Sequence, residues 1–171
     1  VGIFKNRSNI TSLDLNIQLE EAAPMQEMFS GCTKLESISG IEEMSTEGLT
    51  NLNSMFRNCY KLKDLDLSRW DVSSVTNMDY MFTNCYELTG IGGFDWETEN
   101  LISAIAIFAN CKKLVIDGEN ISFNWNPISL TYIFNEDSKN PLSMFTGCES
   151  ITYLRQYDPD DWGNQCTINN M

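Results

Sequence analysis

Apolar positions recur along this chain in one frame that repeats about every 26 residues, a period typical of proteins built from stacked repeats. A phenylalanine anchors each copy, and in most copies a cysteine follows three residues later and a leucine or isoleucine six residues later. The anchors are Phe4, Phe29, Phe56, Phe82, Phe108 and Phe145, with successive differences in residue number of 25, 27, 26, 26 and 37. This self-similarity predicts a stack of similar units.

Each repeat contains two different apolar periods. Before the anchor, apolar residues lie three or four positions apart, as in Met78 and Phe82, which is the spacing of one helical face. After the anchor, apolar and polar residues alternate, as in Leu65, Asp66 and Leu67, which is the spacing of a half-buried strand. Since no unit can bury its apolar side alone, the units must stack. The predicted fold is an α/β solenoid of about six coils, with short parallel strands on one face and short helical turns on the other.

The spacing of the anchors also predicts the domain organisation. Phe134 lies one normal period after Phe108, so the last interval is one repeat plus an insertion at about residues 134–144. We expect residues 1–171 to form a single solenoid with a C-terminal cap at about residues 155–171. Because the chain begins inside a repeat, we expect it to be part of a longer protein. No apolar run approaches the roughly 20 residues that cross a bilayer, so no direct membrane insertion is expected.

The charge of the chain limits its partners. It carries 24 acidic residues against 11 lysines and arginines, a net charge of -13 at pH 7. A phosphate backbone would be repelled by most of such a surface, so nucleic acid is not an expected partner.

Residues that carry catalytic or metal chemistry are scarce. The chain contains no histidine, which excludes histidine-based triads and histidine-containing metal sites. Its repeat cysteines lie one per coil, without the close pairs of a zinc site, and we expect buried thiols, with disulfides between neighbouring coils as the alternative. Trp70 and Trp96 recur at the same offset from their anchors, which favours packing over a ligand platform. The sequence therefore predicts no catalytic residue, no cofactor and no metal.

The outward positions of the predicted strands form the candidate binding face. Concave repeat surfaces bind partners without a deep pocket, and small, polar and acidic side chains suit a basic or hydroxyl-rich partner. The alternative is that this face is merely soluble and that the chain is a spacer which presents another domain. The candidate residues are Ser12, Asp14, Ser37, Ser39, Asp64, Asp66, Tyr153 and Arg155.

The segment MFRNCYKLKDLDLSRWDVSSVTNMDYMFTNC resembles the leucine-rich repeats of the BspA-like bacterial surface proteins. The resemblance extends from about Gly2 to Leu154 and departs from the repeat pattern at Arg7, which replaces the cysteine, and at Ile107, which replaces methionine. It implies a leucine-rich-repeat fold, an extracellular or cell-surface location, and adhesion to an extracellular-matrix protein, another surface protein or a glycan. No catalytic residue belongs to the family pattern. The expected function is therefore a non-enzymatic binding module from a longer surface protein, with a structural stalk as the alternative.

Overall fold

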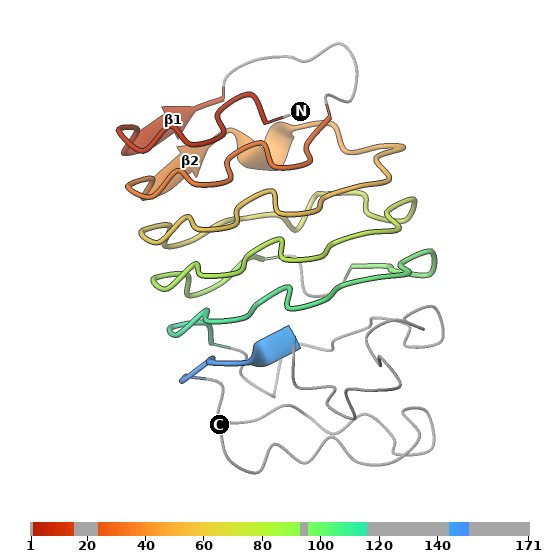
Figure 1. Ribbon diagram of the computed structural model, residues 1–171. Helices are drawn as coiled ribbons and strands as arrows, with labels where there is room; N and C mark the ends of the chain where they lie inside the picture. Colours follow the sequence, from red (N-terminus) through yellow and green to blue (C-terminus); the bar gives the residue numbers. More distant parts are fainter. Residues whose placement is uncertain (1, 16–23, 93–95, 116–143, 151–171) are drawn as a thin grey trace.

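The computed structural model of the chain describes residues 2–15, 24–92, 96–115 and 144–150. In these ranges the chain runs through successive coils that lie above one another, each coil corresponding to one repeat (Figure 1). The insertion predicted at 134–144, apart from Met144, and the cap predicted at 155–171 lie outside the described residues.

Parallel strand pairing follows the anchor in the first two coils. β1 (Ser12–Asp14) and β2 (Ser37–Ser39) pair in parallel, with Ser12 opposite Ser37. In later coils the same position gives a single bridge, between Asp64 and Gly90. Gly92 limits the pairing between the third and fourth coils, because its φ of +67° is incompatible with an extended strand. The predicted strands are thus confirmed in two coils and reduced to a bridge between the next two.

The predicted helical turns are wrong, because the described residues contain no α-helix. The segment around each anchor is a series of β-turns: the Met28 N–H donates to the Met25 carbonyl (3.1 Å) and the Cys32 N–H to the Phe29 carbonyl (3.0 Å). Intervening amides donate out of the coil, as from Phe29 to the Met55 carbonyl (2.9 Å). In an α-helix these amides would bond to residues four positions earlier in the same segment.

Left-handed residues on both sides of the anchor prevent a helix from forming. The residue two positions after it has positive φ, for example 63° at Asn58 and 65° at Asn84, and Ser54, two positions before its anchor, has φ 55°. Left-handed residues occur singly in turns and at helix ends, and asparagine and glycine tolerate that conformation best. A 3-10 helix, η1 (Ile41–Glu43), follows Gly40 at φ 78°, and Met144 and Phe145 also have 3-10 conformation.

The core is a column of anchor rings. Neighbouring phenylalanine rings lie 5.3–5.6 Å apart between centroids, with interplanar angles of 3–10°. That interval approximates the spacing of paired strands, so one ring fits on each coil. Phe145 stacks on Phe108 despite the longer interval between them in the sequence. The stacked rings therefore confirm the periodicity of the anchors in the sequence. Because the rings are aligned, residues at the same offset from each anchor also lie above one another. The six rings belong to Phe4, Phe29, Phe56, Phe82, Phe108 and Phe145.

A second column consists of buried thiols. Each thiol donates to the carbonyl oxygen of the anchor in the preceding coil, with Sγ to O distances of 3.0–3.2 Å. All five are free cysteines, as the sequence predicts, and the disulfide alternative is wrong for them. Burial raises the pKa of each thiol, that of Cys148 to about 11. They are small core residues that also satisfy a buried carbonyl. The column contains Cys32, Cys59, Cys85, Cys111 and Cys148.

Candidate binding surface

The structure brings six of the eight predicted face residues together on three successive coils. One column lies eight residues after the anchors and the other lies ten residues after them. All six side chains are exposed, whereas the residue between the two columns is buried in the second and third coils, with Ile38 7% and Leu65 6% exposed. Tyr153 and Arg155 lie outside the described residues. The polar strand row, as this surface is called below, consists of Ser12, Ser37 and Asp64 in one column and Asp14, Ser39 and Asp66 in the other.

Local hydrogen bonds hold the carboxylates of the polar strand row in place. The Asp66 Oδ1 accepts from the backbone N–H of Ser68 (3.1 Å) and from its hydroxyl (2.6 Å). These two bonds favour the carboxylate and lower the pKa of Asp66, so this side chain is charged at neutral pH. Asp64 accepts a hydrogen bond from the Thr89 hydroxyl in the next coil. Hydrogen bonds therefore hold two of the three carboxylates of the row in position.

A close approach between coils explains one glycine beside the row. A Cβ at Gly92 would lie 2.8 Å from the Asp66 Oδ1 and 3.3 Å from its Cα, closer than ordinary contacts allow. Position 92 also needs positive φ, which glycine adopts without strain. The two columns of polar side chains therefore do not continue into the fourth coil, where Gly90 and Gly92 occupy the equivalent positions.

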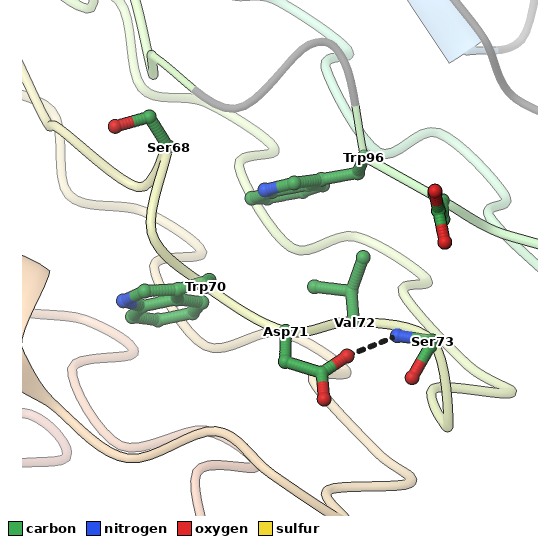
Figure 2. A pocket seen from close by; sticks show the side chains of 7 residues that line it. Ser68, Trp70, Asp71, Val72, Ser73 and Trp96 are labelled. Atoms are coloured by element: carbon green, nitrogen blue, oxygen red, sulfur yellow. Dashed lines mark hydrogen bonds between the residues drawn. The ribbon is translucent and has the colours of Figure 1, made fainter.

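A pocket of about 220 Å³ lies on another part of the coils, beside two tryptophans (Figure 2). Trp70 and Trp96 are only 4% and 3% exposed. Their indole Nε1–H groups donate to the Ile41 carbonyl (2.9 Å) and the Leu67 carbonyl (3.1 Å). Neither ring offers a free face or a free N–H to a ligand, so both are packing residues, as predicted. Trp125 and Trp162 lie outside the described residues. The lining comprises Ser68, Trp70, Asp71, Val72, Ser73, Trp96 and Glu97.

Two further kinds of feature are absent from the described ranges. No group of three or more cysteine, aspartate or glutamate side chains there is arranged to hold a metal ion. In the same part of the chain, no helix is long and apolar enough to cross a bilayer.

An asparagine ladder was missed in the sequence. Asn84 donates through Nδ2 to the Asn58 Oδ1 (2.7 Å), and Asn110 donates in the same way to Asn84 (2.8 Å). Where the ladder position is glycine, the neighbouring asparagine fills the space: a Cβ at Gly31 would lie 2.2 Å from the Asn6 Oδ1. The signal was an asparagine or glycine two residues after every anchor. This ladder stabilises the turns and lies within the stack, so it is structural.

Stacked rings, aligned thiols and repeated polar rows together define a repeat protein. The chain belongs to the family DUF285, described as "Mycoplasma protein of unknown function", whose model matches residues 2–123. Neither the curated proteins nor the solved structures gave a significant match. The matched range contains five of the six anchors, so the family pattern and the stacked part of the structure coincide over most of their length.

Proposed function

We propose that this chain is an extracellular, cell-surface binding module whose polar strand row contacts a host or neighbouring-cell macromolecule. One observation carries the proposal: six exposed serine and aspartate side chains form two aligned columns, while the apolar residues between them are buried in two of the three coils. A repeated row of this kind offers many weak polar contacts to one extended partner. The module has no catalytic role in this proposal, which agrees with a chain that contains no histidine.

The fold that we propose is a leucine-rich-repeat solenoid of the BspA-like kind. Parallel coils offset by one sequence repeat support it, as do leucines six residues after the anchors that are fully buried, such as Leu35, Leu62 and Leu88. The β-turn series in place of helices makes each coil a compact variant of that fold. Surface display follows from the same resemblance and is part of the proposal.

The chemistry of the row favours a basic or hydroxyl-rich partner. Asp14, Asp64 and Asp66 supply three carboxylates, and Ser12, Ser37 and Ser39 supply hydroxyl groups. Each exposed charge pair contributes less than about 1 kcal/mol, so binding needs several coils at once. An extracellular-matrix protein, another surface protein or a glycan with many hydroxyl groups would meet this requirement.

A structural stalk is the second candidate, and the core favours it. The ring column is continuous over six coils, and backbone hydrogen bonds join each coil to the next, as from Phe56 to the Met81 carbonyl (2.9 Å). Such a stack forms a stiff spacer whether or not its surface binds anything.

Binding of the purified chain to an array of matrix proteins and neutral glycans separates the two candidates. Ser37→Arg places a bulky cation at the centre of the row, and an Asp14→Lys/Asp66→Lys variant reverses its charge. Thr50→Arg is the matched control, because Thr50 is exposed but lies outside the polar strand row. Circular dichroism and a thermal melt confirm that each variant folds.

We expect saturable binding that weakens about tenfold or more in Ser37→Arg and in the charge-reversed variant, and that is unchanged in Thr50→Arg. A blank array for the unmodified chain would favour the stalk. Equal losses in Ser37→Arg and Thr50→Arg would show that the polar strand row is not the contact surface.

A further inference from the structure

Eight of the 11 lysines and arginines lie in the turns that follow the anchors. The residues that follow each anchor, called the turn edge below, carry eight lysines and arginines against three glutamates, which leaves a net charge of +5. Since the whole chain has a net charge of -13, the remainder carries -18. Because the coils stack in register, these turns lie above one another as one surface. The turn edge consists of residues 5–11, 30–36, 57–63, 83–89, 109–115 and 146–150.

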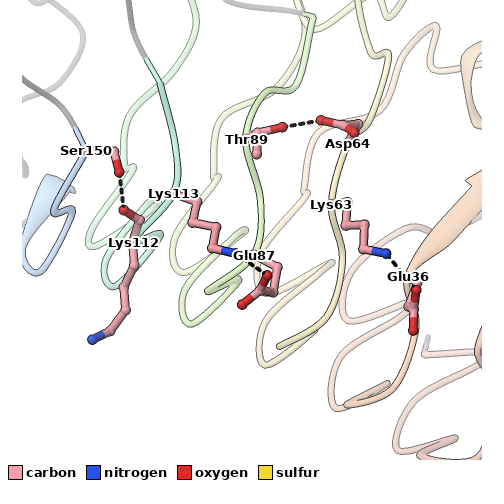
Figure 3. A network of polar contacts seen from close by, with 8 residues as sticks. All are labelled: Glu36, Lys63, Asp64, Glu87, Thr89, Lys112, Lys113 and Ser150. Atoms are coloured by element: carbon pink, nitrogen blue, oxygen red, sulfur yellow. Dashed lines mark hydrogen bonds and ion pairs between the residues drawn. The ribbon is translucent and has the colours of Figure 1, made fainter.

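Ion pairs between neighbouring coils use all three glutamates of the turn edge. Lys63 Nζ lies 2.8 Å from Glu36, and Lys113 Nζ lies 2.6 Å from Glu87 (Figure 3). The third glutamate, Glu149, pairs with Lys112 at 2.7 Å. The glutamates are therefore neutralised within the edge, and its remaining cations determine its field.

Two of the remaining cations occupy equivalent places on consecutive coils. Lys34 and Lys61 each lie five residues after their anchor, and both are exposed. Neither forms an ion pair with another described residue. In addition to the ion-pair partners of Glu36 and Glu87, Lys61 lies close enough to lower the pKa of both carboxyl groups. An anion that lies across both coils would gain contacts with Lys34 and Lys61 together.

Aromatic side chains lie on the turn edge and next to it. Tyr60 and Tyr86 stack with ring centroids 5.1 Å apart, and both are partly exposed. The Arg57 guanidinium lies over the Tyr80 ring, 5.2 Å from its centroid. Tyrosine and arginine are enriched where proteins bind partners, since both combine a flat apolar surface with a polar end.

We propose that the turn edge binds a linear acidic polysaccharide, sulfated or carboxylated, that runs along the stack across Lys34 and Lys61. The turn edge borders the polar strand row, and Thr89 of the edge donates a hydrogen bond to Asp64 of the row. The two surfaces use different residues, so the inference goes beyond the proposed function and does not depend on it. The rest of the chain has a negative net charge and repels the same polymer, which favours binding at the turn edge.

The main chain of the turn edge disfavours an acidic peptide as the partner. The Lys63 N–H donates to the Glu36 carbonyl (3.2 Å) and the Thr89 N–H to the Lys63 carbonyl (2.8 Å), so these groups are not available for strand addition. A flexible peptide would then gain only side-chain contacts while losing its conformational freedom. A stiff polymer with charges at regular intervals loses less entropy and can pair with cations on successive coils.

The experiment measures binding of heparin, polygalacturonate and neutral dextran to the full chain by isothermal titration calorimetry at two salt concentrations. Lys34→Gln/Lys61→Gln removes the two unpaired cations. Ser45→Glu/Ser74→Glu is the matched control, because it changes the net charge by the same two units at exposed positions outside the turn edge. A single-stranded DNA of equal charge competes in a separate titration.

We expect heparin, polygalacturonate or both to bind, dextran not to bind, and salt to weaken binding steeply. The dissociation constant should rise about tenfold in the lysine double variant and less than about twofold in the control. Which of the two polymers binds distinguishes sulfate from carboxylate recognition. The proposal is overturned if neither acidic glycan binds at low salt, if both double variants weaken binding equally, or if DNA binds more tightly than both glycans.

Discussion

Replacement of one ring in the anchor column tests whether the coils are held together by it. Phe82 lies in the middle of the column, is 0% exposed, and stacks on Phe56 at 5.4 Å and on Phe108 at 5.3 Å. Phe82→Ala would leave a cavity between two coils and remove both ring contacts. Phe4→Ala is the matched control, because Phe4 ends the column, is partly exposed and stacks on Phe29 alone.

The magnitude follows from burial and from the number of ring contacts. Phenylalanine to alanine in a tightly packed core costs about 3–5 kcal/mol, and an aromatic pair adds about 0.5–1.5 kcal/mol beyond its buried area. With both ring faces covered, Phe82→Ala should lower the free energy of unfolding by about 4–5 kcal/mol. Phe4→Ala, with one ring contact and partial exposure, should cost about 1–2 kcal/mol.

Urea denaturation followed by circular dichroism and tryptophan fluorescence gives both values. A domain in the middle or upper part of the ordinary range of about 5–15 kcal/mol can lose about 4–5 kcal/mol and still show a native baseline at low temperature. A cost for Phe82→Ala below about 2 kcal/mol, or equal costs for the two variants, would refute the continuous column.

Two further predictions concern the ladders beside the rings. Asn84→Gly should lower the free energy of unfolding by about 1–2 kcal/mol, because two hydrogen bonds are lost. Asn84→Ala should lower it by about 1 kcal/mol more, because alanine is strained at φ 65°. Equal stabilities of the two variants in urea would contradict the left-handed turn. The buried thiols have folded pKa values above the unfolded value of 9.0, that of Cys148 at about 11, so the native chain retains protons that the unfolded chain loses above pH 9. The stability they contribute is fully present below pH 9 and falls as the pH rises above 9. In urea titrations under reducing conditions, the decline is about 1.4 kcal/mol per pH unit for each thiol that is still protonated in the folded chain. Cys85→Ala should make that decline shallower by one thiol, and an unchanged slope would show that its thiol is not buried in the folded chain.

The sequence correctly predicted the features that recur in the repeats. The prediction was wrong where the same spacing of apolar residues fits two different local structures. Phenylalanine, cysteine and leucine recur at constant offsets, and that was sufficient to predict stacking, the thiol column and the exposed polar columns. Apolar residues three apart fit a helix and also fit successive β-turns, which join residues three apart. The asparagine or glycine two residues after each anchor decided between the two structures. This residue acts through its positive φ, which the spacing of apolar residues does not reveal.

The sequence predicted where the candidate surface lies in each coil, but not at which coil it ends. Alternation after the anchor placed Asp14, Ser39 and Asp66 on one face, because side chains on a strand alternate sides. The sequence did not show that Gly92 interrupts the strand, since that depends on the contact of its backbone with Asp66 in the preceding coil. The turn edge was missed for a similar reason: its cations belong to different repeats and meet only when the coils stack in register.

Scalar couplings across hydrogen bonds, measured by NMR on the isotope-labelled chain, test the stacking register most directly. Both proposed surfaces depend on that register. The structure predicts a coupling between the Phe56 amide nitrogen and the Met81 carbonyl carbon, because the amide donates to that carbonyl at 2.9 Å. A coupling from the same nitrogen to the carbonyl carbon of Leu52, four residues earlier, would instead indicate an α-helix and would contradict the stacked coils.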